Sequence, residues 1–243
     1  MKNKHCHSRE SGNPNMKMDA RLKISGMTAV LIFLLSFVVP ATALLGDEAF
    51  NLDKFLLDIE KSESTINSVS FTYTQEIAFT LTNEKQGSAG EASFLKPDNV
   101  CVKQHKPLEQ TIITNGSKVW IFTPDYNQVI QDSWSKWTKN SMIPESLVNM
   151  GQNWKELKQK YSFTYLTKDG RNQVLLLTGK QDTSWTLKIW VDDVSYYINK
   201  MVLNGENVSI TTTAFNYKIN DPAINKSIFD FKAPKGVEIM KMP

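Results

Sequence analysis

A stretch of strict alternation from Val69 to Leu81 limits, more than any other feature, what this chain can fold into. Its odd positions read Val, Phe, Tyr, Gln, Ile, Phe and Leu, and its even positions read Ser, Thr, Thr, Glu, Ala and Thr. Only a β-strand places alternate residues on opposite faces, so we predict a single strand here, far longer than the usual length of about five or six residues. The apolar side of this strand needs a cover, and what covers it bears on the function.

Further strand signals dominate the rest of the chain. The clearest is Asn115-Gly116, a hairpin signal, because both residues tolerate positive φ. Short turns separate the other segments in the same way, which predicts an antiparallel meander of about ten or eleven strands. Besides the long strand, the predicted strands are 91–95, 99–103, 110–114, 118–122, 128–134, 161–167, 174–178, 186–191, 198–203 and 208–217.

Two segments break the strand pattern. Over residues 51–64 apolar side chains recur at positions i, i+3, i+4 and i+7, which predicts a one-sided amphipathic helix. Residues 139–158 lack alternation, with Pro144 suited to a helix start and Gly151 to a helix end. Both segments can fold over the apolar face of the sheet. The predicted fold class is therefore mainly β with a helical lid, in which sheet and helices enclose an apolar cavity.

The N-terminal region carries the pattern of a secretory signal peptide. Three basic residues precede the apolar run 29–39, and Ala41-Thr42-Ala43 follows as an A-x-A cleavage signal. The run is shorter than the ~20 residues of a membrane span. We predict a signal peptide over 1–43 and a single domain over 44–243, exported to a periplasm-like space. Residues 1–15 do not resemble the start of a signal peptide, so the true start codon can lie at a later methionine.

The composition of the mature chain excludes one class of partner. Removing residues 1–43 takes away six of the 28 Lys and Arg residues and two of the 25 Asp and Glu residues, which changes the net charge from +3 to about −1. Arg171 is the one arginine that remains. Nucleic-acid binders carry an arginine-rich basic surface, so we expect no such partner. Cys101 is the single remaining cysteine and lies in an apolar alternating segment, which predicts a structural thiol and no intramolecular disulfide.

Residues suited to catalysis are scarce. His105 is the single histidine left after processing and precedes a Lys-Pro pair, so we interpret it as a solvated turn residue. The chain has no G-x-S-x-G motif, no phosphate-binding loop and no His/Cys spacing suited to zinc. We therefore predict no catalytic residue, no metal and no cofactor. Paired acids such as Asp192-Asp193 leave a glycosidase-like enzyme open, although adjacent strand residues point in opposite directions.

The six tryptophans leave a sugar-binding interpretation open through ring stacking. Trp120, Trp185 and Trp190 lie within apolar alternating segments, which is more typical of a core or a cavity lining. Trp134 and Trp137 directly precede the helical segment 139–158 and can anchor a lid or face a partner.

Five segments, taken in order, carry a resemblance to a known family. Tyr73-Thr74-Gln75 matches an F-x-Q motif, residues 90–97 read Gly-Glu-Ala-Ser-Phe-Leu-Lys-Pro, and residues 113–124 read Ile-Thr-Asn-Gly-Ser-Lys-Val-Trp-Ile-Phe-Thr-Pro. Ile-Pro opens residues 143–148, and residues 229–237 read Phe-Asp-Phe-Lys-Ala-Pro-Lys-Gly-Val. This series resembles the LolA family, the periplasmic carriers of outer-membrane lipoproteins, and it spans nearly the whole mature chain.

The resemblance implies a fold and a set of partners. The fold is an unclosed antiparallel half-barrel of about eleven strands covered by short helices. The cargo is acylated lipoproteins, taken from an inner-membrane lipoprotein-releasing ABC transporter and passed to an outer-membrane lipoprotein receptor. A LolA-like carrier works in the periplasm as a monomer, hydrolyses no ATP itself and is not an enzyme.

The resemblance also bears on individual residues. The family has an arginine where Lys96 stands, and that arginine holds the lid shut, so Lys96 is the expected lid latch. Lysine lacks the planar five-donor fork of arginine, which predicts a looser lid. Val100 and Val102 replace a bulkier Phe and Trp. The residues expected to line the acyl cavity share an apolar strand face or the lid: Phe71, Tyr73, Phe94, Val100, Val102, Ile112, Trp120, Leu147 and Val148. The same residue types fill an ordinary hydrophobic core, so core packing remains the alternative role for each of these residues.

Two other classes of function stay open. The first is a LolA-like sensor of lipid or lipoprotein, or a glycolipid-binding protein, that regulates a partner. The second is an enzyme that acts on a polysaccharide or a lipid with carboxylates alone.

Overall fold

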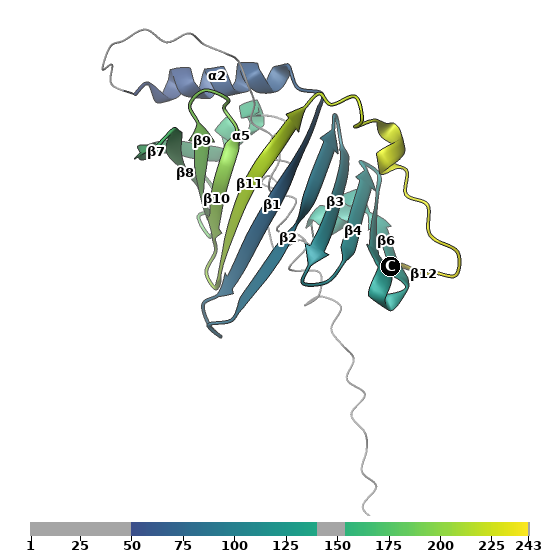
Figure 1. Cartoon of the computed structure of the whole chain (residues 1–243). Coiled ribbons are helices and arrows are strands. Elements are labelled where there is room, and N and C mark those ends of the chain that lie inside the picture. The colour runs from purple at the N-terminus through teal and green to yellow at the C-terminus, as the bar shows by residue number, and fades with distance from the viewer. Residues whose placement is uncertain (1–49, 140–153, 243) are drawn as a thin grey trace, which may run out of the picture.

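The computed structural model describes residues 50–139 and 154–242, so the predicted signal peptide and the middle of the predicted lid lie outside the described residues. Twelve strands form one unclosed sheet in the order β12-β6-β5-β4-β3-β2-β1-β11-β10-β9-β8-β7 (Figure 1). Neighbouring strands are antiparallel except for β12 and β6, which are parallel. The predicted mainly β fold, an open sheet with short helices, is confirmed.

The strands are close to the predicted segments, with one addition. Their bounds are β1 Ser68–Phe79, β2 Lys85–Leu95, β3 Asn99–Lys106, β4 Gln110–Asn115, β5 Lys118–Thr123, β6 Gln128–Ser133, β7 Tyr161–Asp169, β8 Asn172–Gly179, β9 Thr186–Asp192, β10 Ile198–Asn204, β11 Val208–Ile219 and β12 Glu238–Lys241. The sequence did not predict β12. Its four residues are all exposed, so it has no one-sided apolar pattern.

The long alternating strand forms at the centre of the sheet, although it ends at Phe79 and not at the predicted Leu81. β1 is 12 residues long and pairs with β2 on one side and β11 on the other. β2 is 11 residues long, whereas only residues 91–95 were predicted. Gly87 and Gly90 interrupt the side-chain pattern in its first half, and glycine is depleted in ordinary strands.

The Asn-Gly hairpin also forms where predicted. Gly116, between β4 and β5, has a φ of +83°, which favours glycine because it has no Cβ. A Cβ on Gly116 would lie 2.6 Å from the Cβ of Asp98, so a side chain here would also collide with the neighbouring turn.

Helices cover one face of the sheet. α2 (Leu52–Ser64) begins at Asn51, whose side chain accepts a hydrogen bond from the backbone N–H of Lys54 at 2.9 Å. α3 (Trp134–Lys139) follows β6, and α5 (Trp154–Lys160) precedes β7. In Figure 1 α2 crosses the end of the sheet where β1 begins, and α5 lies behind the sheet. No helix among the described residues has the length and apolar character needed to cross a membrane.

The two faces of the sheet bury separate clusters of side chains. The face under the helices, here called the inner face, forms the main hydrophobic core together with side chains from α2, α3 and α5. On the opposite, outer face a smaller cluster gathers Cys101, Ile113, Ile224 and Phe229. The segment after β11, including the 3-10 helix η3 (Lys226–Phe229), supplies part of that cluster before β12 joins the edge of β6. A second 3-10 turn, η2 (Pro124–Tyr126), links β5 to β6.

Candidate functional site

Six of the predicted cavity residues lie together on the inner face. Phe71 is 3% exposed, Tyr73 0%, and the other four no more than 3%. Strand register explains their proximity, because Phe71 is opposite Ala92, Ala92 is opposite Val102, and Val102 is opposite Ile112. The six residues, all in the main core cluster, are Phe71, Tyr73, Phe94, Val100, Val102 and Ile112.

Side chains from the helices cover this apolar surface. Phe55 and Ile59 on α2 belong to the same cluster as the inner face, and so do Trp154 and Leu157 on α5. Trp137 on α3 joins them, and its ring stacks on that of Trp134 with a centroid distance of 5.3 Å. Trp137 is therefore buried in the core and does not face a partner.

The remaining predicted cavity residues are not placed with these six. Trp120 faces the outer side, in the cluster that contains Ile113, and its ring stacks on Phe231 at a centroid distance of 6.0 Å. The register pairs Trp120 with Ile113, whereas Ile112 pairs with Ile121. Leu147 and Val148 lie outside the described residues.

Lys96, the predicted latch, contacts the last turn of α2. Its ammonium Nζ donates a hydrogen bond to the backbone carbonyl of Glu63 at 2.8 Å. The same carbonyl also accepts a hydrogen bond from the backbone N–H of Ile66 at 3.1 Å, so Lys96 adds a second donor, and a lysine at this end of a helix interacts favourably with the helix dipole. Lys96 thus joins the end of β2 to the helix that covers the inner face.

The side chain of Glu63 also joins α2 to neighbouring elements, through Lys96 after β2 and Trp154 at the start of α5. It is 5% exposed, and burial raises the pKa of its carboxyl to about 7, while Lys96 and a hydrogen bond from the backbone N–H of Trp154 act in the opposite direction. A nearby ion pair joins Glu60 on α2 to Lys158 on α5 at 2.5 Å. Two covering helices and the sheet therefore meet at one buried carboxyl. The sequence shows only that Glu63 is an acid at the end of an amphipathic helix, and it did not predict that this carboxyl is buried.

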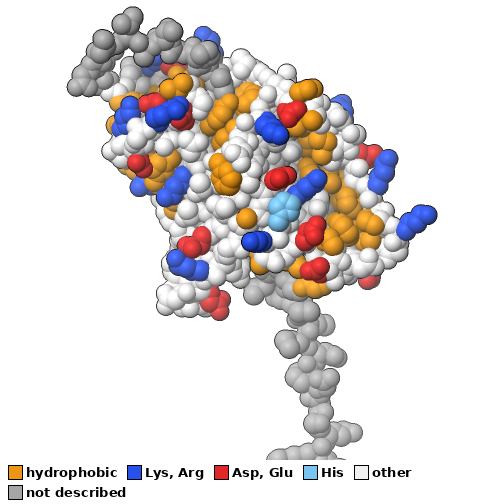
Figure 2. Space-filling view, in the orientation of Figure 1, with side chains coloured by type: hydrophobic (Ala, Val, Ile, Leu, Met, Phe, Trp, Pro, Cys, Tyr) orange, Lys and Arg blue, Asp and Glu red, His pale blue; other side chains and the backbone are white. Residues whose placement is uncertain are grey.

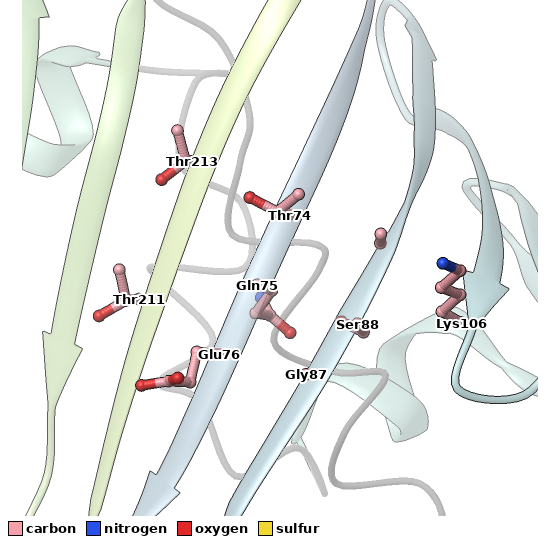
Figure 3. Close-up of a pocket in the computed structure, with 9 residues that line it drawn as sticks. Thr74, Gln75, Glu76, Gly87, Ser88, Lys106, Thr211 and Thr213 are labelled. Atoms are coloured by element: carbon pink, nitrogen blue, oxygen red, sulfur yellow. The ribbon is translucent and has the colours of Figure 1, made fainter.

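The outer face carries a polar pocket of about 440 Å³. Figure 3 shows its lining residues on β1, β2 and β11, with Lys106 reaching in from β3: Thr74, Gln75, Glu76, Gly87, Ser88, Ala89, Lys106, Thr211 and Thr213. Strand alternation places the side chains of Thr74 and Glu76 on the face opposite to Tyr73, so the pocket opens on the outer side, whereas the side chains of Gln75 and Ser88 share the inner face with Tyr73. Its one carboxylate, on Glu76, is held by Lys85 at 2.9 Å, which leaves no acid pair for hydrolysis.

Figure 2 shows the same outer face in space-filling form. Hydrophobic side chains gather beside the C-terminal segment, and charged groups are scattered over the rest. His105 is exposed, as expected of a solvated residue, but it lies within β3 and not in the predicted turn. Among the residues that the structure describes, no cluster of His, Cys, Asp and Glu suits a metal ion.

The adjacent acids at the end of β9 have structural partners. Burial acts to raise the pKa of the Asp192 carboxyl, but hydrogen bonds from Ser195 and Val194, together with Arg171, outweigh it and lower that pKa. Asp193 pairs with Lys168 at 2.9 Å. The general acid of a glycosidase needs a raised pKa, which Asp192 lacks.

Comparison with known proteins gives consistent matches. The sequence model of the family described as outer membrane lipoprotein carrier protein LolA matches residues 64–232. An outer-membrane lipoprotein carrier protein of Coxiella burnetii (strain CbuK_Q154) is 25% identical over 220 residues, which cover 89% of this chain and 96% of that protein. A protein of the same name from Methylobacillus flagellatus is 26% identical over 159 residues, covering 65% and 75%.

A solved structure shares the fold. The crystal structure of an uncharacterized conserved protein from Thermus thermophilus matches with a TM-score of 0.51 and 10% identity, covering 79% of this chain and 100% of that one. At this identity the likeness concerns the fold alone. The match to the family, in contrast, extends over most of the sequence, and the chain therefore belongs to the LolA family of outer-membrane lipoprotein carrier proteins.

Proposed function

We propose that this chain carries acylated lipoproteins by binding their acyl chains against the inner face of the sheet, beneath α2 and α5. The observation that carries the proposal is the continuous apolar surface formed by Phe71, Phe94, Val100, Val102 and Ile112. Short helices from separate segments cover it. Lys96 joins α2 to the end of β2 through the carbonyl of Glu63, and the ion pair between Lys158 and Glu60 joins α5 to α2. Residues 44–243 act as one carrier domain in this proposal.

The physical need for such a carrier follows from the hydrophobic effect. Each CH₂ group removed from water contributes about 0.8 kcal/mol, so three acyl chains exposed to water cost on the order of tens of kcal/mol. A carrier offers the chains an apolar surface during the aqueous crossing. The side chains of α2 and α5 that now cover the inner face then give way to acyl chains of similar chemistry.

The relatives' name and the predicted signal peptide support a route through the periplasm toward the outer membrane. The chain works in the periplasm, receives its cargo from an inner-membrane lipoprotein-releasing ABC transporter and delivers it to an outer-membrane lipoprotein receptor. The protein acts as a monomer, without a catalytic role. An apolar binding face accepts and releases cargo without a covalent step, so it needs no cofactor.

Two measurements test this proposal. Delipidated protein is titrated with a fluorescent long-chain fatty acid, and saturable binding with a blue-shifted emission is expected. Depletion of the protein in its host is expected to leave outer-membrane lipoproteins at the inner membrane. Correct lipoprotein sorting after depletion would contradict the carrier role and favour a sensor.

A further inference from the structure

The inner face is not uniformly apolar, because polar side chains cross it in two adjacent rows. We call this set the polar band; its members come from six adjacent strands and are Thr212 on β11, Gln75 on β1, Ser88 on β2, Gln104 on β3, Gln110 on β4 and Thr123 on β5. Five of them are buried, and Ser88 is half-buried. Cross-strand register arranges them in two adjacent rows. Gln75 is opposite both Thr212 and Ser88, whereas Gln104 is opposite Gln110 and Gly90, and Gly90 is opposite Tyr73, two residues before Gln75.

Part of the hydrogen-bonding capacity of the band is used within the protein. The amide Nε2 of Gln75 donates to the hydroxyl of Thr212 at 2.9 Å, and the amide Nε2 of Gln110 donates to the hydroxyl of Thr123 at 3.0 Å. The Gln104 amide donates to the carbonyl of Leu108 at 3.1 Å. These bonds hold the glutamine side chains in fixed orientations.

Three polar atoms at the band have no partner. The hydroxyl of Tyr73, the carbonyl Oε1 of Gln75 and the hydroxyl of Ser88 are buried without a hydrogen bond to any group in the described part of the chain. A buried polar group without a partner costs roughly 1–3 kcal/mol, and most such groups in folded proteins are satisfied. Together the three atoms offer two hydroxyl donors and one carbonyl acceptor.

Gly90 keeps the space beside the Tyr73 hydroxyl free of a side chain. Gly90 is directly opposite Tyr73 in the sheet, and a Cβ built on it would lie 2.9 Å from the Tyr73 hydroxyl and closer still to the carbonyl oxygen of Lys103. A side chain at this position would collide with both groups. Glycine is therefore required for the hydroxyl to approach the backbone of β2.

Apolar side chains separate the band from α2. Phe71, Phe94 and Val100 lie between the band and the end of the sheet that α2 crosses (Figure 1). Moving away from α2 along β1, the inner-face side chains change from Val69 and Phe71 to Tyr73 and then Gln75. The surface is thus apolar beneath α2, polar at Gln75 about four residues further along the strand, and apolar again at Ile77, which is buried in the main core cluster.

We propose that the polar band is a subsite for the ester and amide linkages that join acyl chains to a lipoprotein, so that the acyl tails point toward α2. This inference rests on the proposed function. The hydroxyls of Tyr73 and Ser88 donate to ester or amide carbonyls, and the carbonyl of Gln75 accepts from the N–H of the N-acyl group. The band sets the depth at which the chains enter, and it distinguishes an acylated lipopeptide from a hydrocarbon without polar linkages.

The test compares two probes on delipidated protein. One is a fluorescent lipopeptide with an N-acyl-S-diacylglyceryl cysteine, and the other is a pyrene-labelled alkane of similar chain length, which has no linkage to recognise. We expect the variant Tyr73→Phe, Gln75→Met, Ser88→Ala to weaken lipopeptide binding by about tenfold or more. Its affinity for the alkane should stay within about twofold of the wild type.

Gln173→Met is the matched control. Gln173 is a buried glutamine on β8 whose carbonyl also has no partner in the described part of the chain, but it lies outside the polar band. We expect this variant to bind both probes like the wild type. The single variants Tyr73→Phe and Ser88→Ala are measured as well, in case the triple variant does not fold; each removes one hydroxyl and is expected to weaken lipopeptide binding by at least threefold.

The outcomes separate the two proposals. If the wild type binds both probes and the band variants lose no lipopeptide affinity, the three atoms hold water and the subsite is overturned, while the carrier role stands. If the wild type binds neither probe, the carrier role fails and the subsite fails with it. A photoreactive group at the acyl terminus is expected to label α2, and labelling of β1 and β2 near Gln75 instead would overturn the orientation.

Discussion

At the scale of single residues, Lys96 attaches β2 to α2, and we expect a lysine at this position to hold the helix less firmly than an arginine. Its ammonium makes one hydrogen bond to the carbonyl of Glu63, at 2.8 Å. The carbonyls of Lys61 and Ser62 in the same turn accept hydrogen bonds from Ser64 and Thr65. A guanidinium nevertheless offers two donors side by side in a planar fork, so it can add a second bond to this helix end. The lysine is therefore expected to hold α2 more loosely than the arginine of the family would.

The variant Lys96→Arg tests this expectation. We expect amide hydrogen exchange in the last turn of α2 to slow by about threefold to tenfold, which corresponds to roughly 0.7–1.4 kcal/mol. Lys103→Arg, at an exposed position of β3, is the matched control and should leave the exchange of α2 unchanged. Equal exchange rates in Lys96→Arg and the wild type would show that the lysine already holds the helix as firmly as arginine.

At the scale of elements, α2, α5 and the end of β2 meet at the carboxyl of Glu63. Burial raises the pKa of this carboxyl from 4.5 to about 7, so the folded state binds a proton that the unfolded state releases between these pH values. Stability falls with rising pH wherever the folded state binds more protons. The contribution of Glu63 is thus most favourable below pH 4.5 and is lost as the pH rises toward 7.

Thermal unfolding at several pH values tests the role of this carboxyl. We expect the wild-type Tm to fall by several degrees between pH 5 and pH 7.5, since each pKa unit corresponds to about 1.4 kcal/mol and each kcal/mol to roughly 2–4 °C. Glu63→Gln stays uncharged throughout and should remove most of this slope. Glu91→Gln, at an exposed position on β2, is the control that should keep it. A slope that survives in Glu63→Gln would assign the pH dependence to other groups.

At the scale of the whole molecule, the two faces of the sheet have separate roles. The inner face packs against helices, whereas the outer face is stabilised by the C-terminal segment through Phe229, which is 1% exposed. The backbone of that segment continues into β12 and pairs with β6, which covers one edge of the open sheet. Stability and binding are therefore expected to respond to different residues.

Phe229→Ala tests this separation. Removal of a buried phenylalanine typically costs about 3–5 kcal/mol, so we expect a marked loss of stability in urea unfolding. Affinity for a fluorescent fatty acid, measured below the unfolding midpoint, should stay within about twofold of the wild type. Phe231→Ala, at a half-buried neighbour, should cost less. A similar loss of affinity in Phe229→Ala would show that the two faces are coupled.

Much of the fold could be predicted because the signals for it are local. Alternation from Val69 onward identified β1, the spacing of apolar residues identified α2, and Asn115-Gly116 identified the β4–β5 hairpin. In contrast, β12 has no one-sided pattern and forms because β6 offers an unpaired edge. β6 lies more than a hundred residues before β12 in the sequence, so the residues of β12 carry no local pattern that predicts the pairing.

The sequence by itself determined which side chains share a face within each strand, and therefore that an apolar sheet surface needs a cover. Only the tertiary structure decided how neighbouring strands align, and with it that Trp120 faces outward, that Gln75 is opposite Ser88 and that Gln104 lies in the adjacent row with Tyr73. The reason is that register depends on turns and bulges, such as the irregularity between Ala89 and Gly90. A shift of one residue moves every side chain of a strand to the other face.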